Sequence, residues 1–123
     1  MMERRKEPRF LIRDNAFAVD AYKPQRLGKI IDISRSGISF QYMEGADNFQ
    51  PSTELHIFSS IHSIFLRDVP FEATSDLRIS GHPASIIFMR RHGGRFPSLS
   101  DQQQAQLDKF IDIHSVGVAG THI

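Results

Sequence analysis

Hydrophobic and polar residues alternate along most of this chain, in short runs separated by turn residues. Near the start, Phe17, Val19 and Ala21 alternate with Ala18 and Asp20. A period of two is that of a β-strand, in which successive side chains point to opposite faces. Similar strand-like segments follow along the chain: residues 27–34, 38–42, 55–59, 63–69, 72–79 and 84–91. Short strands at this spacing predict an antiparallel barrel or sandwich.

Turns and loops are predicted where Gly, Pro and polar residues gather. Residues 36–37, 81–83 and 92–94 contain Gly and are expected to turn the chain between or after strands. Residues 44–52 are mostly polar and contain a Pro near their end, so they are expected to form a loop.

A single helix is predicted near the C-terminus. Ser100 can cap its start, and Gln103 follows three residues later, as in a capping box. Apolar residues then recur at helical spacing on one face: Leu107, Phe110 and Ile111. We expect this helix to cover the barrel with that face and to end near Gly117.

The composition is that of one folded domain. A chain of 123 residues has room for one hydrophobic core, and 40% hydrophobic and 24% charged residues are ordinary globular values. With 10 Phe and no Trp or Cys, the core must consist of Phe and aliphatic side chains, without disulfides or thiolate-bound metal. The lack of Cys fits a reducing compartment, and no export signal is recognised, so we expect a soluble cytoplasmic protein.

Positive charge is concentrated at the N-terminus. Residues 1–13 hold five Arg and Lys against two Glu, a charge of +3, while the whole chain carries +1. Pro8 and the lack of an apolar period predict an extended, flexible arm that an anionic partner would meet first. We therefore divide the chain into a flexible basic arm (1–13), a β-barrel with its helix (14–115) and a loose tail (116–123).

One candidate motif follows the second predicted strand. Asp32 and Ser34 are separated by one residue and would share a face, with Ile31 and Ile33 on the other. A carboxylate can accept hydrogen bonds from the N1 and N2 hydrogens of guanine, and a hydroxyl can donate or accept. Gly37, at the turn, would let a ligand or the backbone come close. The alternative is that these are ordinary solvent-facing residues leading into a turn.

A second candidate motif lies in the basic arm. Arg5 and Arg9 are separated by three residues, and arginine suits phosphates and guanine edges because its donors form a fork. The spacing is not specific, since Arg9 with Arg13 and Arg91 with Arg95 repeat it. Taken alone, the pattern also fits a solvated basic tail.

Together the two motifs resemble the PilZ domain family, in which an RxxxR arm precedes the first strand and D/N-x-S-x-x-G follows the second. The alternating strands, an Ile-Ile-Phe segment before a Gly-rich turn, and a closing helix with Leu and Phe are also similar. The resemblance covers about residues 3–115. It implies a six-stranded antiparallel β-barrel with a C-terminal helix, in a bacterial receptor for cyclic di-GMP.

The resemblance also implies a role for each motif residue. Arg5 and Arg9 would clasp phosphates and guanines, Asp32 would recognise a guanine, Ser34 would hydrogen-bond the ligand and Gly37 would provide clearance. Two neighbouring arginines are candidate auxiliary contacts: Arg4 and Arg35. Apart from this ligand, no cofactor or metal is expected.

The expected mechanism is an ordering of the arm. Like charges and little apolar surface should keep the free arm flexible, and a ligand with two phosphates would fold it over the face of Asp32 and Ser34. The ordered arm would then present a new surface to an unidentified downstream protein. We expect no attached catalytic or DNA-binding domain to receive the signal within this chain.

Other functions are compatible with the same sequence. The same fold could serve as a protein-interaction adaptor that binds no nucleotide. A barrel that binds single-stranded nucleic acid would stack bases on exposed aromatic residues, for which the candidates are Phe10, Phe40 and Tyr42. A homodimer could form through an apolar edge made of Ile61, Ile64 and Phe65.

An enzyme is the function that the sequence favours least. The six His show no HxxxH pair, and the His92-Gly93-Gly94 segment lacks the G-x-S-x-G elbow that a hydrolase oxyanion loop would accompany. Asp108 and Asp112 are expected to be neighbours on a helix surface rather than a catalytic dyad.

Overall fold

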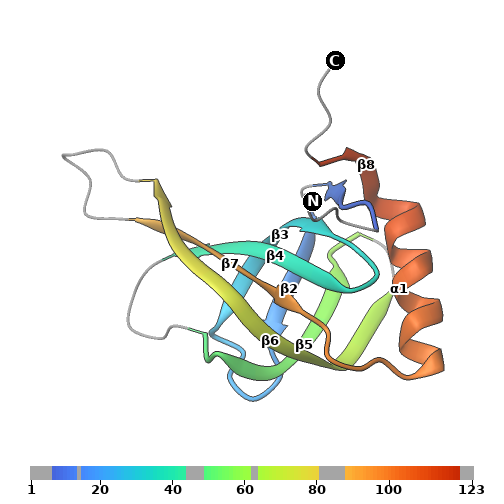
Figure 1. Cartoon of the computed structure of the whole chain (residues 1–123), viewed down its shortest axis with the longest axis horizontal. Coiled ribbons are helices and arrows are strands. Elements are labelled where there is room, and N and C mark those ends of the chain that lie inside the picture. The colour runs from blue at the N-terminus through green and yellow to red at the C-terminus, as the bar shows by residue number, and fades with distance from the viewer. Residues whose placement is uncertain (1–6, 14, 44–48, 62–63, 81–87, 120–123) are drawn as a thin grey trace, which may run out of the picture.

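The computed structural model describes residues 7–13, 15–43, 49–61, 64–80 and 88–119. Its regular structure is almost entirely β, with a helix near the C-terminus (Figure 1). The elements are, in chain order, β1 (Phe10–Ile12), β2 (Ala16–Asp20), β3 (Leu27–Ile33), β4 (Gly37–Met43), β5 (Ser52–Ser59), β6 (Phe65–Ser80), β7 (Met89–Arg95), α1 (Asp101–His114) and β8 (Ser115–Val118).

Six of the described strands close into an antiparallel barrel. They follow the order β2-β5-β6-β7-β4-β3, and pairing of β2 with β3 closes the ring. Outside it, β1 pairs with β3 and β8 pairs with β1, so two short strands extend the sheet from β3. The predicted six-stranded antiparallel barrel with a C-terminal helix is confirmed.

The strands β6 and β7 differ most from their predicted form. Residues 63–69 and 72–79 are expected to be separate strands, but β6 runs through 16 residues, and with β7 it projects from the barrel as a two-stranded ribbon (Figure 1). The turn predicted at residues 92–94 is wrong, because these residues lie inside β7. A Cβ built on Gly94 would collide with the Glu72 carbonyl and the Phe71 ring, so glycine here allows close strand packing. The turn predicted at residues 81–83 lies outside the described residues.

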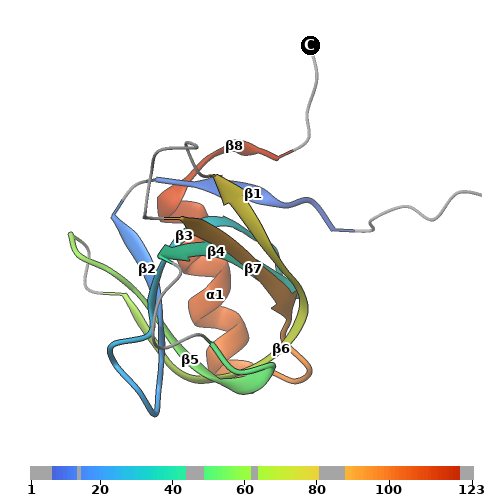
Figure 2. The same cartoon turned by 90° about the vertical axis from the view of Figure 1, so that its left-hand side faces the viewer.

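The helix α1 closes one end of the barrel. Viewed along the barrel, it lies behind the ring of strands (Figure 2). Ser100 and Gln103 form the predicted capping box, with Ser100 Oγ accepting from the Gln103 N–H at 3.0 Å. The helix ends at His114 rather than near Gly117, because Ser115 turns to an extended conformation and begins β8. None of the helical segments within the described residues has the length and apolar run that crossing a bilayer requires.

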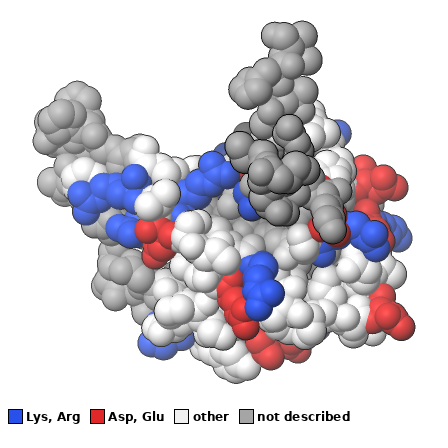
Figure 3. Space-filling view, viewed as in Figure 1, with Lys and Arg blue, Asp and Glu red and all other residues white. Residues whose placement is uncertain are grey.

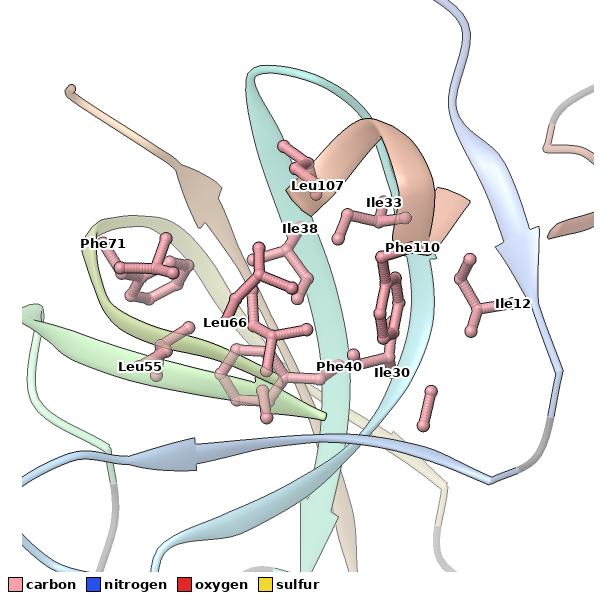
Figure 4. Packing of buried hydrophobic residues seen from close by; sticks show 14 of the residues in the cluster. Ile12, Ile30, Ile33, Ile38, Phe40, Leu55, Leu66, Phe71, Leu107 and Phe110 are labelled. Carbon is pink, nitrogen blue, oxygen red and sulfur yellow. The ribbon is translucent and has the colours of Figure 1, made fainter. Parts of the chain in front are cut away.

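The core is formed where the helix meets the inner faces of the strands. Leu107 and Phe110 are fully buried and point from α1 toward isoleucines of β1, β3 and β4 (Figure 4). Phe40 and Tyr42 are buried as well, at 0% and 4% exposed, so neither can serve as a platform for stacked bases. Phe10 is partly buried against the same core.

Short strands lie at both ends of the described chain. Part of the expected arm forms β1, and the start of the expected tail completes β8. Backbone bonds join the two ends, since the Arg13 N–H donates to the His114 carbonyl at 3.0 Å and the Ala119 N–H donates to the Arg9 carbonyl at 2.7 Å. Neither segment has a strong strand pattern alone, and each is held by pairing with the other.

Candidate functional site

The predicted turn motif lies between β3 and β4. Ser34 directly follows β3, and the residue is 4% exposed. Its Oγ accepts hydrogen bonds from the backbone N–H groups of Ser36, at 3.2 Å, and Gly37, at 3.1 Å. The Ser34 N–H donates to the Gly37 carbonyl at 2.8 Å. Ser34 therefore closes the turn, a local role for which serine is well suited.

Gly37 is required by the packing of β4 against β7. A Cβ built on this residue would lie 2.5 Å from the carbonyl oxygen of Gly94. That distance is far inside a normal contact, so any side chain would force the two strands apart. The sequence predicts that Gly37 leaves room for a ligand or for backbone. Within the described residues, the backbone of Gly94 occupies that room.

Asp32 reaches the site through a bulge in β3. The register with β4 shifts between Ile30 and Asp32, so Ile31 is an extra residue in the ladder. Ile30 and Ile33 are therefore both in the core, at 1% and 0% exposed, while Ile31 is half-buried. The prediction that Ile31 and Ile33 share one face is wrong, because the bulge changes the alternation between them.

Asp32 is nearly buried, at 3% exposed, and β7 supplies its main partner. Arg91 Nη2 donates to Asp32 Oδ2 at 2.8 Å and to Ser39 Oγ at 3.1 Å. The other carboxylate oxygen, Oδ1, is buried and makes no hydrogen bond within the described part of the chain. No hydrogen bond within the described residues replaces the water that this oxygen loses on burial, so Asp32 has unused capacity to accept one.

Arg9 brings the basic arm to the same carboxylate. Its Nη1 lies 3.7 Å from Asp32 Oδ1, and the Arg9 side chain is 34% exposed. The pairing of Leu11 with Asp32 between β1 and β3 fixes this approach. The second arginine of the arm motif and the acidic residue of the turn motif therefore meet in space.

A cleft of about 190 Å³ lies beside these residues. Ligand pockets usually measure about 300–1,000 Å³, so a cleft of this size would hold part of a ligand such as one phosphate or one base edge. Arginines at its rim and hydroxyl groups inside it suit an anionic, oxygen-rich group. The lining residues are Arg9, Ser34, Ser36, Gly37, Thr74, Gly94 and Arg95.

The structure brings together four of the residues singled out from the sequence. Arg9, Ser34 and Gly37 line the cleft, and Asp32 forms an ion pair with Arg9. Arg35 takes another direction: its Nε donates to Asp108 Oδ1 of α1 at 3.1 Å, and both side chains are about half exposed. The remaining two candidates, Arg4 and Arg5, lie outside the described residues.

Five further residues of the site are not among the predicted ones: Ser36, Thr74, Arg91, Gly94 and Arg95. A signal for two of them is present, since Arg91 and Arg95 repeat the RxxxR spacing. Four residues is an even number, so on a strand these side chains point to the same face. A turn at residues 92–94 would break the strand between Arg91 and Arg95, so the predicted turn hides the fact that the two side chains share a face.

A second, larger cavity of about 350 Å³ lies at the start of α1 and holds none of the motif residues. Gln103 lines it, but its amide already donates to the Arg67 and Asp68 carbonyls, at 2.9 Å and 3.1 Å. Among the described residues that line it, Arg67 and Asp68 are the charged ones. The smaller cleft, where cations converge, is therefore the better candidate site.

His92 of β7 lies in an aromatic cluster with Phe40, Tyr42, Phe49 and Phe71. The residue is 2% exposed, and its Nδ1 is 3.5 Å from Asp76 Oδ2. Burial lowers the pKa of His92, with Asp76 acting in the opposite direction. Burial and the nearby Asp76 raise the pKa of Tyr42 to about 12, so Tyr42 stays a hydrogen-bond donor to Asp76 at neutral pH.

The charge pattern of the surface agrees with an anionic partner. Lys and Arg gather over the projecting ribbon on the face shown in Figure 3. Three arginines are contributed by β6 and β7 in this region: Arg78, Arg90 and Arg91. Arg90 is paired with Asp76 at 2.9 Å, whereas Arg91 points to the candidate site.

Comparison with solved structures identifies similar folds. MrkH, a c-di-GMP-dependent transcription regulatory factor, matches with a TM-score of 0.56 and 16% identity over 90% of this chain. MotI/DgrA, an inhibitor of motility from Bacillus subtilis, matches with a TM-score of 0.50 and 20% identity, also over 90% of this chain. The chain spans about half of each, 51%. No family model and no curated protein sequence matches it. The barrel is thus PilZ-like in fold.

Proposed function

We propose that this chain is a receptor for cyclic di-GMP, which binds over the outer surface of β3, β4 and β7. The observation that carries the proposal is the meeting of Arg9 with Asp32 beside the cleft that Ser34 lines. The arm and the turn are far apart in the sequence, and each motif alone has an ordinary explanation. Their convergence on one buried carboxylate is the arrangement that a site for phosphate and guanine requires.

Each group at the site has a chemical role that suits this ligand. Asp32 Oδ1 can accept from the N1 and N2 hydrogens of guanine, and it lacks a hydrogen bond among the described residues. Arg9 and Arg95 flank the cleft and can bind phosphate oxygens as forked donors. Arg5, four residues before Arg9, is proposed as a further phosphate ligand.

The size of the cleft supports a role for the arm. At about 190 Å³ it can enclose only part of a dinucleotide, so the rest of the ligand would lie on the barrel surface. The basic residues that precede β1 are proposed to cover that exposed part. The arm would then take one path with the ligand and another without it, and a downstream protein would recognise the difference.

The comparison with MrkH supports the choice of nucleotide, because MrkH is a c-di-GMP-dependent factor. The contribution of Ser34 and Gly37 is proposed to be indirect. Both residues shape the turn, through the bonds of Ser34 Oγ and the close approach of Gly37 to β7. They thereby place Asp32 and the cleft rather than holding the ligand through side-chain bonds of their own.

Isothermal titration of the purified chain with cyclic di-GMP tests the proposal. We expect saturable binding that weakens with rising salt, because arginines and phosphates interact electrostatically. Arg9→Ala and Asp32→Ala should each weaken binding at least about tenfold, the loss of one charge-assisted contact. Arg67→Ala is the matched control, since Arg67 packs over Phe65 at 4.8 Å, away from the cleft.

Two results would contradict the proposal. The first is an absence of heat with cyclic di-GMP at millimolar protein and ligand. The second is binding that Arg9→Ala and Asp32→Ala leave at the strength of the Arg67→Ala control. Either result would favour the adaptor that binds a partner protein without nucleotide.

A further inference from the structure

The geometry points to Arg91 as a positioning residue for guanine recognition, which holds one oxygen of Asp32 and leaves the other for the base. This inference rests on the proposed function. Arg91 lies on β7, outside both motifs, and is paired across the strands with Gln41 of β4. Its side chain is 40% exposed, so it lies at the rim of the site rather than in the core.

Arg91 fixes the orientation of the Asp32 carboxylate. The same nitrogen, Nη2, donates to Asp32 Oδ2 at 2.8 Å and to Ser39 Oγ at 3.1 Å. Asp32 and Ser39 face each other across β3 and β4, so this nitrogen bridges two adjacent strands. Rotation of the carboxylate would break the short bond, and Oδ2 is therefore held on the side of β7.

The second oxygen is consequently directed away from Arg91. Oδ1 is buried and has no hydrogen bond within the described residues, and Arg9 Nη1 lies 3.7 Å from it. A buried acceptor without a donor is an unfavourable arrangement that a donor can relieve. A guanine edge supplies donors at N1 and N2, which would meet Oδ1 once Arg9 moves aside to a phosphate.

A direct contact of Arg91 with a phosphate is the competing role, and base chemistry separates the two. Cyclic di-IMP keeps the phosphates, O6, N7 and the N1 hydrogen of cyclic di-GMP but lacks the N2 amino group. A residue that acts through Asp32 changes the preference between these ligands. A residue that contacts a phosphate weakens both equally.

The experiment measures the affinities of the full chain for cyclic di-GMP and cyclic di-IMP by isothermal titration, in the wild type and in Arg91→Gln. We expect the wild type to prefer cyclic di-GMP about tenfold, the effect of one buried hydrogen bond. Arg91→Gln should reduce the preference to about threefold or less and weaken cyclic di-GMP binding about tenfold. Arg67→Gln is the charge-matched control and should keep the wild-type preference.

Folding is checked by thermal unfolding of each variant, because Arg91→Gln removes the hydrogen bond to Asp32 Oδ2 and leaves the buried carboxylate paired only with Arg9 among the described residues. The double variant Asp32→Asn with Arg91→Gln has no unpaired buried charge. It should bind cyclic di-GMP within about threefold of Asp32→Asn alone, since Arg91 acts through Asp32.

The outcomes separate the inference from the proposed function. If the wild type binds no cyclic di-GMP, the proposed function fails. If the wild type binds and Asp32→Asn weakens it, but folded Arg91→Gln keeps the wild-type preference or loses both ligands equally, Arg91 has no positioning role. A wild type without preference for cyclic di-GMP over cyclic di-IMP overturns the inference as well.

Discussion

Two aspartates on neighbouring barrel strands, Asp20 at the end of β2 and Asp32 in β3, are almost equally buried, at 1% and 3% exposed. Their bonding differs. Asp20 accepts from the Tyr22 N–H at 2.8 Å, from Arg26 at 3.1 Å and from Thr53 at 3.3 Å, which engages both oxygens. Asp32 accepts hydrogen bonds on one oxygen only within the described residues.

The arginine partners differ in the same direction. Arg26 is 9% exposed and lies with Asp20 inside the fold, whereas the Arg91 side chain is 40% exposed. A buried carboxylate whose two oxygens both accept hydrogen bonds from the protein gains little from a ligand. One with an oxygen left unbonded can gain from a ligand. Burial alone therefore does not distinguish the two carboxylates, whereas the hydrogen bonding of their oxygens does.

The strongest test of this comparison is the stability of Asp20→Ala against Asp32→Ala. Asp20→Ala leaves Arg26 buried without its main acceptor and should lower the free energy of unfolding by about 3–5 kcal/mol. Asp32→Ala leaves Arg91 free to turn toward water and should lower it by about 1 kcal/mol or less. Urea unfolding followed by circular dichroism measures both. Equal losses would mean that the two carboxylates have the same structural role.

The parts of the fold that are predictable from the sequence are those whose signals are local. The helix is predictable in this way. Ser100 and Gln103 form the capping box at its start, and Leu107 and Phe110 follow at helical spacing. The bulge at Ile31 is not predictable, because it arises from the register of β3 with β4. Glycine is typical of turns, so Gly94 is predicted to lie in one. The strand contains a glycine here because β6 passes too close for a side chain.

The site divides in the same way. Asp32, Ser34 and Gly37 stand close together in the sequence, so a motif can identify them. Arg91 bonds to Asp32 across 59 residues, and that contact exists because β7 pairs with β4 beside the bulge. Arginines are common on strand surfaces, so nothing local marks Arg91 as the partner of a buried carboxylate.

A second test asks whether the turn motif acts through its carboxylate or through strand packing. Gly37→Ala should lower the free energy of unfolding by about 1–3 kcal/mol, because the new Cβ would lie 2.5 Å from the Gly94 carbonyl. Gly117→Ala is the matched control, since its Cβ would meet Leu11 at an ordinary 4.0 Å. Chemical denaturation of both variants measures the difference. If Gly37→Ala were as stable as the control, the glycine would have to serve the ligand instead.

The smallest expected effect is a pH dependence of stability that arises from the buried imidazole of His92. Neither ring nitrogen of His92 has a hydrogen bond of good geometry within the described part of the chain, although Asp76 Oδ2 is 3.5 Å from Nδ1 and the Gln50 backbone also acts on the ring. The ring is surrounded by aromatic side chains, and burial lowers its pKa below the ordinary value of 6.5. The unfolded chain therefore binds the His92 proton more readily than the folded chain does.

This difference gives the pH dependence a definite sign. Below about pH 6.5 the unfolded state takes up the proton first, so the free energy of unfolding should fall as the pH is lowered toward the depressed pKa. We expect a contribution of about 1 kcal/mol between pH 7.5 and 5.5, measured by urea unfolding. His92→Phe keeps an aromatic ring among Phe40 and Phe49 and should remove that contribution. If His92→Phe kept the wild-type slope, His92 would not be the source of the pH dependence, and its imidazole would titrate alike in the folded and unfolded chains.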